Sequence, residues 1–132
     1  MRELFYYFLK NMNSGSTYAF YGYLRKGMRY YEEFKNDLCY HYSFWLMGYE
    51  MYSLGPYPFA IKSDKPKSKI LVEVMKVEDR NAEKKIYQIE MDAGYYYTDI
   101  MIQNKSVGIF LYERAANYPQ VRHGDWIKFF GS

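Results

Sequence analysis

The stretch "AFYGYLRKG", residues 19–27, joins a strand pattern to a glycine-containing loop. Together with the two residues before it, the pattern predicts a strand that ends at Tyr21-Gly22 and continues into a short loop. A loop of this kind exposes consecutive backbone N–H groups, which can hold a carboxylate or a developing oxyanion. Because glycine turns far more often have a purely structural role, this stretch by itself favours a structural turn over a binding loop.

The remaining patterns indicate an α+β domain whose sheet is mostly antiparallel and barrel-like. We expect helices over residues 28–38 and from Asp79 or Asn81 onward, since both side chains suit a helix N-cap. Strands are expected over residues 40–52, with a bulge at Gly48, and over residues 69–78, 95–103 and 107–113. Helical spacing over residues 1–12 and a break after it predict an N-terminal extension over residues 1–16, ahead of a single domain over residues 17–132.

The composition fits one domain, because 132 residues can bury a substantial core. Cys39 is the only cysteine, so no intrachain disulfide can form, and this usage suits a reducing cytosol. We see no signal peptide and no apolar run near the ~20 residues that cross a bilayer, so a cytoplasmic protein is expected. The 18 tyrosines suggest a wet pocket or a broad interface, and the wealth of Lys, Glu and Tyr favours a thermophilic source.

Three segments follow one another in an informative order: "FYGYLRKG" (20–27), "MYSLGPYPFAI" (51–61) and "GDWIKFF" (124–130). They resemble, respectively, the Tyr-Gly-small-Leu loop, the Tyr-Ser-Leu-Gly-x-Tyr-Pro segment and the Ser/Gly-Asp-Trp ending of small bacterial and archaeal gamma-glutamylcyclotransferase-like proteins. "ILVEVMKV" (70–77) is similar to an intervening strand of that family. The resemblance covers about residues 18–130.

The resemblance implies a small, mostly antiparallel β-barrel with flanking helices and a pocket at its mouth. It implies that Tyr21, Gly22, Tyr23, Leu24 and Tyr57 bind the substrate. Characterised members cyclise gamma-glutamyl amines or amides, because the substrate's α-amine attacks its own γ-carbonyl and releases an amine and 5-oxoproline. The expected partner is a small gamma-glutamyl or other carboxylate-bearing molecule, and neither a metal nor a cofactor is expected.

The position of the family's proton carrier departs from this pattern. "IEMDAG" (89–94) stands where the family reads Leu-Asp-x-x-Glu-Gly, so Glu90 falls on the aspartate and Ala93 on the catalytic glutamate. Alanine cannot carry a proton, and a general acid–base group typically contributes ~10² to 10⁴-fold in rate. The candidate substitutes are Glu90, one helical turn back, and Asp92, which projects roughly 100° away around the helix. Bulky Tyr23 also stands where Ser or Thr is usual.

The sequence therefore leaves open whether the protein is an enzyme. A non-catalytic descendant would use the same pocket to bind a small anionic metabolite. An RNA- or protein-binding module is a third interpretation, based on the basic run "KSDKPKSK" (62–69), but one short run is not a basic face. We expect a solvated loop there and no nucleic-acid partner. His41, His123 and Cys39 have no metal-ligand spacing, so no metal site is expected.

Overall fold

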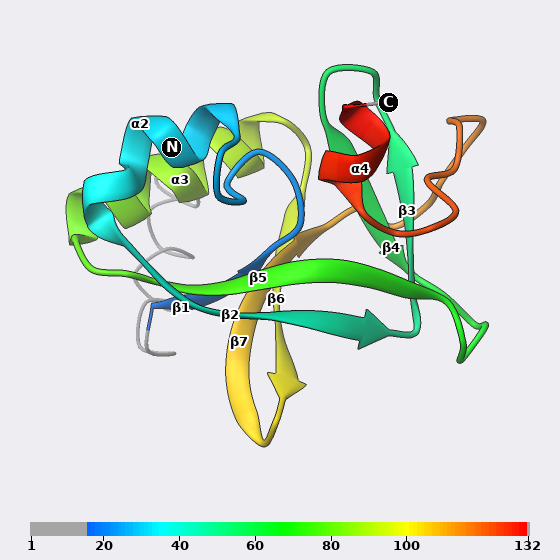
Figure 1. Ribbon diagram of the computed structural model, residues 1–132, viewed down its shortest axis with the longest axis horizontal. Helices are drawn as coiled ribbons and strands as arrows, with labels where there is room; N and C mark the ends of the chain where they lie inside the picture. The colour runs from blue at the N-terminus through cyan, green and yellow to red at the C-terminus, as the bar shows by residue number, and fades with distance from the viewer. Residues whose placement is uncertain (1–15, 132) are drawn as a thin grey trace.

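The computed structural model describes residues 16–131, so the expected N-terminal extension lies outside the described residues apart from Ser16. The chain forms an α+β fold, as predicted (Figure 1). The strands are β1 (Thr17–Phe20), β2 (Leu38–Met47), β3 (Tyr49–Ser53), β4 (Pro58–Lys62), β5 (Lys69–Val77), β6 (Tyr96–Ile102) and β7 (Lys105–Leu111). The helices are α2 (Arg29–Phe34), the 3-10 turn η2 (Lys35–Asp37), α3 (Arg80–Asp92) and α4 (Trp126–Phe130). None of the helices over residues 16–131 is long and apolar enough to cross a membrane.

The strands divide between two sheets. Five form a main sheet in the order β2-β5-β1-β7-β6, and β3 pairs with β4 in a separate ribbon. Every pair is antiparallel except β1 with β7, which run parallel. Across the described residues no ladder joins the edge strands β2 and β6, so the sheet is open and the expected barrel is not confirmed. The β3–β4 ribbon packs beside the sheet instead, where the Tyr112 N–H donates to the Ala60 carbonyl at 2.9 Å.

Gly48 separates two strands that the sequence pattern had joined. Residues 40–52 read as one strand with a bulge at Gly48, but the chain turns there from β2 in the main sheet to β3 in the ribbon. Gly48 has φ +85°, a conformation that side-chain-bearing residues rarely adopt, and its N–H donates to the Ser68 carbonyl at 2.6 Å. The irregularity in β2 lies earlier, between Tyr40 and Tyr42.

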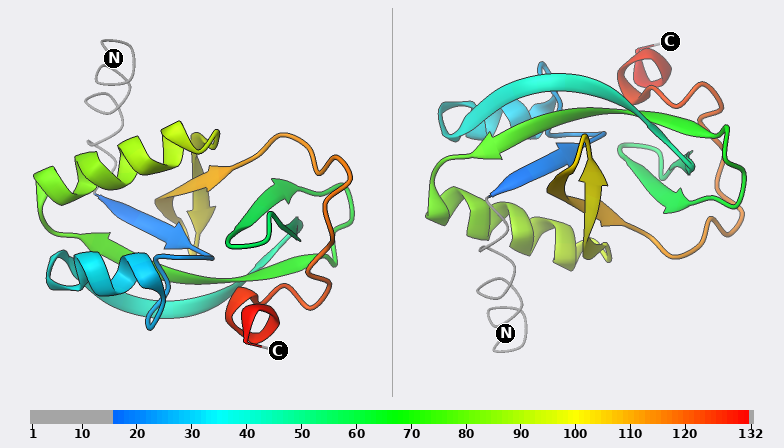
Figure 2. Two further views of the ribbon diagram at one scale, coloured as in Figure 1. Left: turned by 90° about the horizontal axis from the view of Figure 1, so that it is seen from above. Right: turned by 90° about the horizontal axis from the view of Figure 1, so that it is seen from below.

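The residues at the two ends of helix α3 explain where the helix begins and where it ends. The Asp79 carboxylate caps it by accepting the Ala82 N–H at 2.9 Å. Ala82 and Ile86 are buried against the core, and the same stripe leads to Ala93 at the C-cap. Gly94, at φ +93°, then turns the chain toward β6. In both views of Figure 2, β1 runs between α2 and α3, so the end of β1 and these two helices surround the same part of the molecule.

Two groups of buried side chains form the core. One lies around Tyr18, Phe59 and Ile86, and its rings stack, with the Tyr18 and Phe110 centroids 5.9 Å apart. The other lies around Met51, Ile70 and Trp126, which are fully buried.

Candidate functional site

A cavity of about 420 Å³ opens where the residues after β1 meet the C-terminal end of α3. Three segments line it: the loop Tyr21–Leu24, Tyr57 with Pro58 at the start of β4, and the corner from Ile89 to Tyr95. The cavity therefore brings together all five residues for which the sequence predicted substrate binding, and also Glu90, Asp92 and Ala93.

The loop Tyr21–Leu24 presents backbone donors. The Arg25 N–H closes a turn on the Gly22 carbonyl at 3.0 Å, and the carbonyl of Tyr23 accepts the N–H groups of Tyr30 and Tyr31 at 3.1 Å. Within residues 16–131, no hydrogen bond uses the N–H groups of Gly22, Tyr23 or Leu24 as donors. Three consecutive unclaimed donors at a cavity wall are suited to a carboxylate or an oxyanion.

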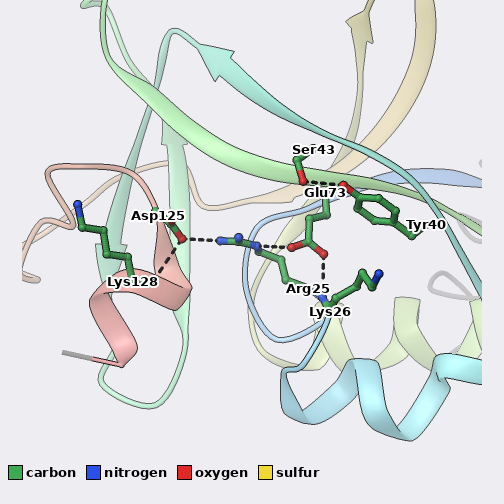
Figure 3. A network of polar contacts seen from close by, with 7 residues as sticks. All are labelled: Arg25, Lys26, Tyr40, Ser43, Glu73, Asp125 and Lys128. Carbon is green, nitrogen blue, oxygen red and sulfur yellow. Dashed lines mark hydrogen bonds and ion pairs between the residues drawn. The ribbon is translucent and has the colours of Figure 1, made fainter.

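Two features hold this loop in place. A Cβ built on Gly22 would lie 2.8 Å from Cγ of Pro58, so only glycine lets the loop pack on β4. Figure 3 shows the second, a buried network in which the Arg25 guanidinium lies between two carboxylates. Its Nε donates to Oε2 of Glu73 at 2.9 Å, and its Nη1 donates to Oδ1 of Asp125 at 2.8 Å. The Lys26 N–H donates to the other oxygen of Glu73 at 2.7 Å, so the loop is bound at both its backbone and its side chain.

Three tyrosine hydroxyls join the segments around the cavity. Tyr21 donates to the Phe110 carbonyl at 2.5 Å and accepts the Ala60 N–H at 3.1 Å. The Tyr21 hydroxyl therefore already has both a hydrogen-bond acceptor and a donor, and Tyr21 contributes its buried ring to a ligand site. Tyr95 donates to the Pro58 carbonyl at 2.5 Å, and Tyr112 donates to the Ala93 carbonyl at 2.6 Å.

The outer wall of the cavity is aromatic. The Tyr23 ring lies 5.4 Å from Tyr30 in an edge-on arrangement and 5.7 Å from Tyr57, measured between centroids. Tyr23 replaces the smaller residue that the family resemblance leads one to expect, and it extends this wall. Arg29 lies outside it, with its guanidinium 5.6 Å from the Tyr30 centroid. The described lining residues include no cationic side chain.

Glu90 is a half-buried carboxyl that lines this cavity. Among residues 16–131, no hydrogen bond or ion pair engages its carboxyl group, and burial raises its pKa to about 8. Burial raises the pKa of the Tyr21, Tyr95 and half-buried Tyr112 hydroxyls, and the Glu90 carboxylate raises the pKa of all three further. A carboxyl whose pKa lies near neutrality can both accept and donate a proton.

Asp92 and Ala93 occupy the rim of the same cavity. Asp92 is exposed, and its Oδ1 accepts a hydrogen bond from Nε2 of Gln88 at 2.8 Å. Ala93 is the C-cap of α3, where the family resemblance puts the catalytic glutamate. The two candidate substitutes from the sequence therefore differ in their surroundings, since only the Glu90 carboxyl has no hydrogen-bond or ion-pair partner among residues 16–131.

Three residues of the loop network escaped the sequence analysis. Glu73 is a lone charged residue inside the apolar run of β5, which is a sign of a buried, paired carboxylate. Arg25 directly follows the loop, and Asp125 belongs to the "GDW" segment, but their contact spans a hundred positions. Sequence spacing gives no indication of such a pairing. Across residues 16–131 there is no group of three potential metal ligands.

Comparisons with known proteins show the family of the chain and solved structures with a similar fold. The family model described as "Gamma-glutamyl cyclotransferase, AIG2-like" matches residues 18–128. A comparison with curated proteins gave no match. Among solved structures, protein PH0828 from Pyrococcus horikoshii is similar with a TM-score of 0.73 and 25% identity, over 86% of this chain and 92% of that chain. Protein ytfP from Escherichia coli has a TM-score of 0.68 and 21% identity, over 86% and 98% of the two chains. Protein c4763 of uropathogenic E. coli has a TM-score of 0.71 and 17% identity, over 88% and 95%. The last two share the fold.

Proposed function

The chain belongs to the gamma-glutamyl cyclotransferase, AIG2-like family, and from this we propose that its cavity cyclises a gamma-glutamyl amine with Glu90 as the proton carrier. The products are 5-oxoproline and the free amine, so the protein is a transferase of the cyclising kind. The functional unit is proposed to be the domain over residues 17–132, acting in the cytoplasm without a metal or cofactor.

The observation that carries this proposal is the unpartnered Glu90 carboxyl, which lines the same cavity as the loop Tyr21–Leu24. The Glu90 carboxylate would remove a proton from the substrate's α-ammonium group. The neutral amine would attack the γ-carbonyl, forming the ring C–N bond, and the oxyanion would be held by the unclaimed N–H groups of the loop. The leaving nitrogen would then take the proton from Glu90 as the amide C–N bond breaks, and the regenerated carboxylate would accept the second proton, which the ring nitrogen loses and which departs with the free amine as its ammonium ion.

The lining also favours a class of leaving group. A gamma-glutamyl amino acid would bring a second carboxylate into a cavity whose described lining has no cation and two acidic residues, Glu90 and Asp92. An alkyl or aryl amine brings no such charge, and its apolar part suits the rings of Tyr23, Tyr30 and Tyr57. We therefore propose a gamma-glutamyl amine as substrate rather than a gamma-glutamyl peptide.

The test is a 5-oxoproline assay with several gamma-glutamyl amines, comparing the wild-type protein with Glu90→Gln and Asp92→Asn. We expect Glu90→Gln to lower kcat by ~10² to 10⁴-fold, since it keeps the shape and removes the proton carrier. Asp92→Asn is the matched control and should keep most of the activity. Equal activity of Glu90→Gln and wild type would refute the role of Glu90.

A second candidate function rests on Ala93. A descendant that lost the family glutamate would bind a small carboxylate-bearing metabolite at the loop N–H groups without turning it over. In that case no gamma-glutamyl amine would give 5-oxoproline, but 5-oxoproline or a related carboxylate would raise the Tm of the protein. Turnover of any member of the panel by the wild-type protein would exclude this alternative.

A further inference from the structure

A second hollow, of about 600 Å³, shares no lining residue with the catalytic cavity. It forms where the loop between β4 and β5 meets the C-terminal segment. Five of its lining side chains are cationic: Lys65, Lys67, Lys69, Arg122 and Lys128. The basic run over residues 62–69 is too short to form a basic face by itself, and residues more than fifty positions later in the chain extend it.

The protein offsets the positive charge of this hollow only in part, through Asp125 in its lining and through Glu50, whose carboxylate interacts electrostatically with Lys65. The ion pairs that connect described residues are Arg25 with Glu73, Arg25 with Asp125, and Lys35 with Glu32, and none involves the five cations. Asp125 is the only acidic residue in the lining. Its carboxylate already accepts hydrogen bonds from the Arg25 guanidinium at 2.8 Å and from the Lys128 backbone N–H at 3.3 Å.

An exposed aromatic ring stands at the same hollow. Trp45, on the edge strand β2, is 40% exposed, whereas the other tryptophan, Trp126, is fully buried. The Nζ atom of Lys69 lies 4.6 Å from the Trp45 ring centroid, which ties the ring to the cationic group. Trp45 therefore leaves part of its ring surface open to solvent beside five cations.

From this arrangement we propose that the hollow binds single-stranded nucleic acid, with the cations contacting successive phosphates and Trp45 stacking on a base. Single-strand sites combine a positively charged groove with aromatic side chains, because every base offers a flat face. An acidic peptide would match the charge but not the ring. A duplex would present its phosphates while keeping its bases away from Trp45.

Tryptophan fluorescence provides a direct test, because Trp126 is shielded and Trp45 is exposed. An oligonucleotide of about 8 thymidines, within the ~4 to 16 nucleotides that small single-strand modules cover, should quench the emission of the full chain. The logarithm of the binding constant should fall with the logarithm of the salt concentration, at a slope of about −0.7 for each phosphate contacted. Quenching should be lost in Trp45→Phe, whose remaining tryptophan is buried.

The charge contribution is tested with paired variants. Lys65→Ala/Lys67→Ala should weaken binding and reduce the magnitude of the salt slope by about 1.4, as expected for two lost phosphate contacts. Lys85→Ala/Lys105→Ala removes the same charge from exposed positions outside the hollow and should leave the slope unchanged. All four side chains are exposed, so the folds should be preserved.

Three results would overturn the proposal. One is the absence of binding at low salt by both fluorescence and a gel-shift measurement. Another is equal loss of affinity in the two lysine pairs, which would indicate a general charge effect. The third is competition by poly-glutamate or by duplex DNA as effective as that of the single strand, which would assign the hollow to polyanions in general. None of these results bears on turnover of gamma-glutamyl amines.

Discussion

At the scale of the residue, the site depends on how burial alters one carboxyl group. Desolvation of Glu90 by burial raises the pKa of its carboxyl to about 8, and no hydrogen bond or ion pair among residues 16–131 offsets that effect. Asp92, two residues on, is exposed and hydrogen-bonded to Gln88. Two acidic residues on one helical turn thus have different chemical properties, because only one of them faces the cavity interior.

Glu90 should make stability depend on pH. Its pKa is about 8 in the folded state and near 4.5 when exposed, so the folded protein binds more protons between these values. The contribution of the protonated Glu90 carboxyl to the free energy of unfolding is complete below about pH 4.5 and is lost as pH rises through about 8. As pH rises across this window, the free energy of unfolding of wild type should fall by up to a few kcal/mol relative to that of Glu90→Gln, since one pKa unit corresponds to about 1.4 kcal/mol. Urea unfolding of both proteins at several pH values measures the difference, and a constant difference would contradict the assignment.

Ala93→Glu restores the residue that the family resemblance predicts at the end of α3. The position is half-buried and lines the cavity, so the new carboxyl has access to a bound ligand. We expect this variant to cyclise gamma-glutamyl amines even when combined with Glu90→Gln, in the 5-oxoproline assay. Ala93→Gln is the isosteric control and should not rescue activity. Failure of the double variant, if it remains folded, would mean that the cavity has lost more than its proton carrier.

At the scale of the element, a buried charge network fixes the loop after β1. Arg25 joins the loop to β5 through Glu73 and to the start of α4 through Asp125. Both side chains of the Arg25–Glu73 pair are only 7% exposed. The orientation of the loop N–H groups thus depends on segments that are remote in the sequence.

Glu73→Gln should destabilise the fold by about 3 kcal/mol, because it leaves Arg25 buried with one fewer counter-charge. Glu32→Gln is the matched control, since it breaks the exposed pair with Lys35, whose atoms are 3.7 Å apart, and such pairs contribute ~0 to 1 kcal/mol. Guanidinium unfolding would measure both. If the two substitutions had equal effects, the network would have no special role.

At the scale of the whole molecule, the open sheet and the β3–β4 ribbon depend on each other. An isolated two-stranded ribbon is at best marginally stable in water. Here the Ala60 amide of β4 donates to the Tyr21 hydroxyl, and Phe59 is fully buried among the rings of the core. The ribbon therefore covers part of the sheet and supports one wall of the cavity.

The ribbon and the sheet should open in a single step. Native-state hydrogen exchange of the Ala60 amide should give the same opening free energy as the amides of Val72 and Val74 in β5, because none can exchange without global unfolding. The Lys105 amide, at the exposed tip of the β6–β7 hairpin, provides the contrast and should exchange faster. A lower opening free energy at Ala60 than at Val72 would show that the ribbon detaches by itself.

Much of the fold was predictable because its elements depend on local chemistry. Short-range patterns predicted a helix cap at Asp79 or Asn81, the buried stripe of α3, and a first strand that gives way to the Tyr21-Gly22 loop, although β1 ends one residue earlier, at Phe20. The family motifs ordered these elements correctly. The corner at Gly48 was missed, since apolar residues continue across it and the positive φ that breaks the strand is not visible in the pattern.

The sequence by itself determined the α+β class, the family and the segments that meet at the cavity, because these follow from local propensity and short motifs. Only the tertiary structure separated Glu90 from Asp92, since burial and hydrogen bonding depend on what packs around a side chain. It also brought Arg25 to Asp125, and Lys65 to Lys128, because such contacts join residues far apart in the chain. Their proximity results from how the sheet, the ribbon and the C-terminal segment pack together.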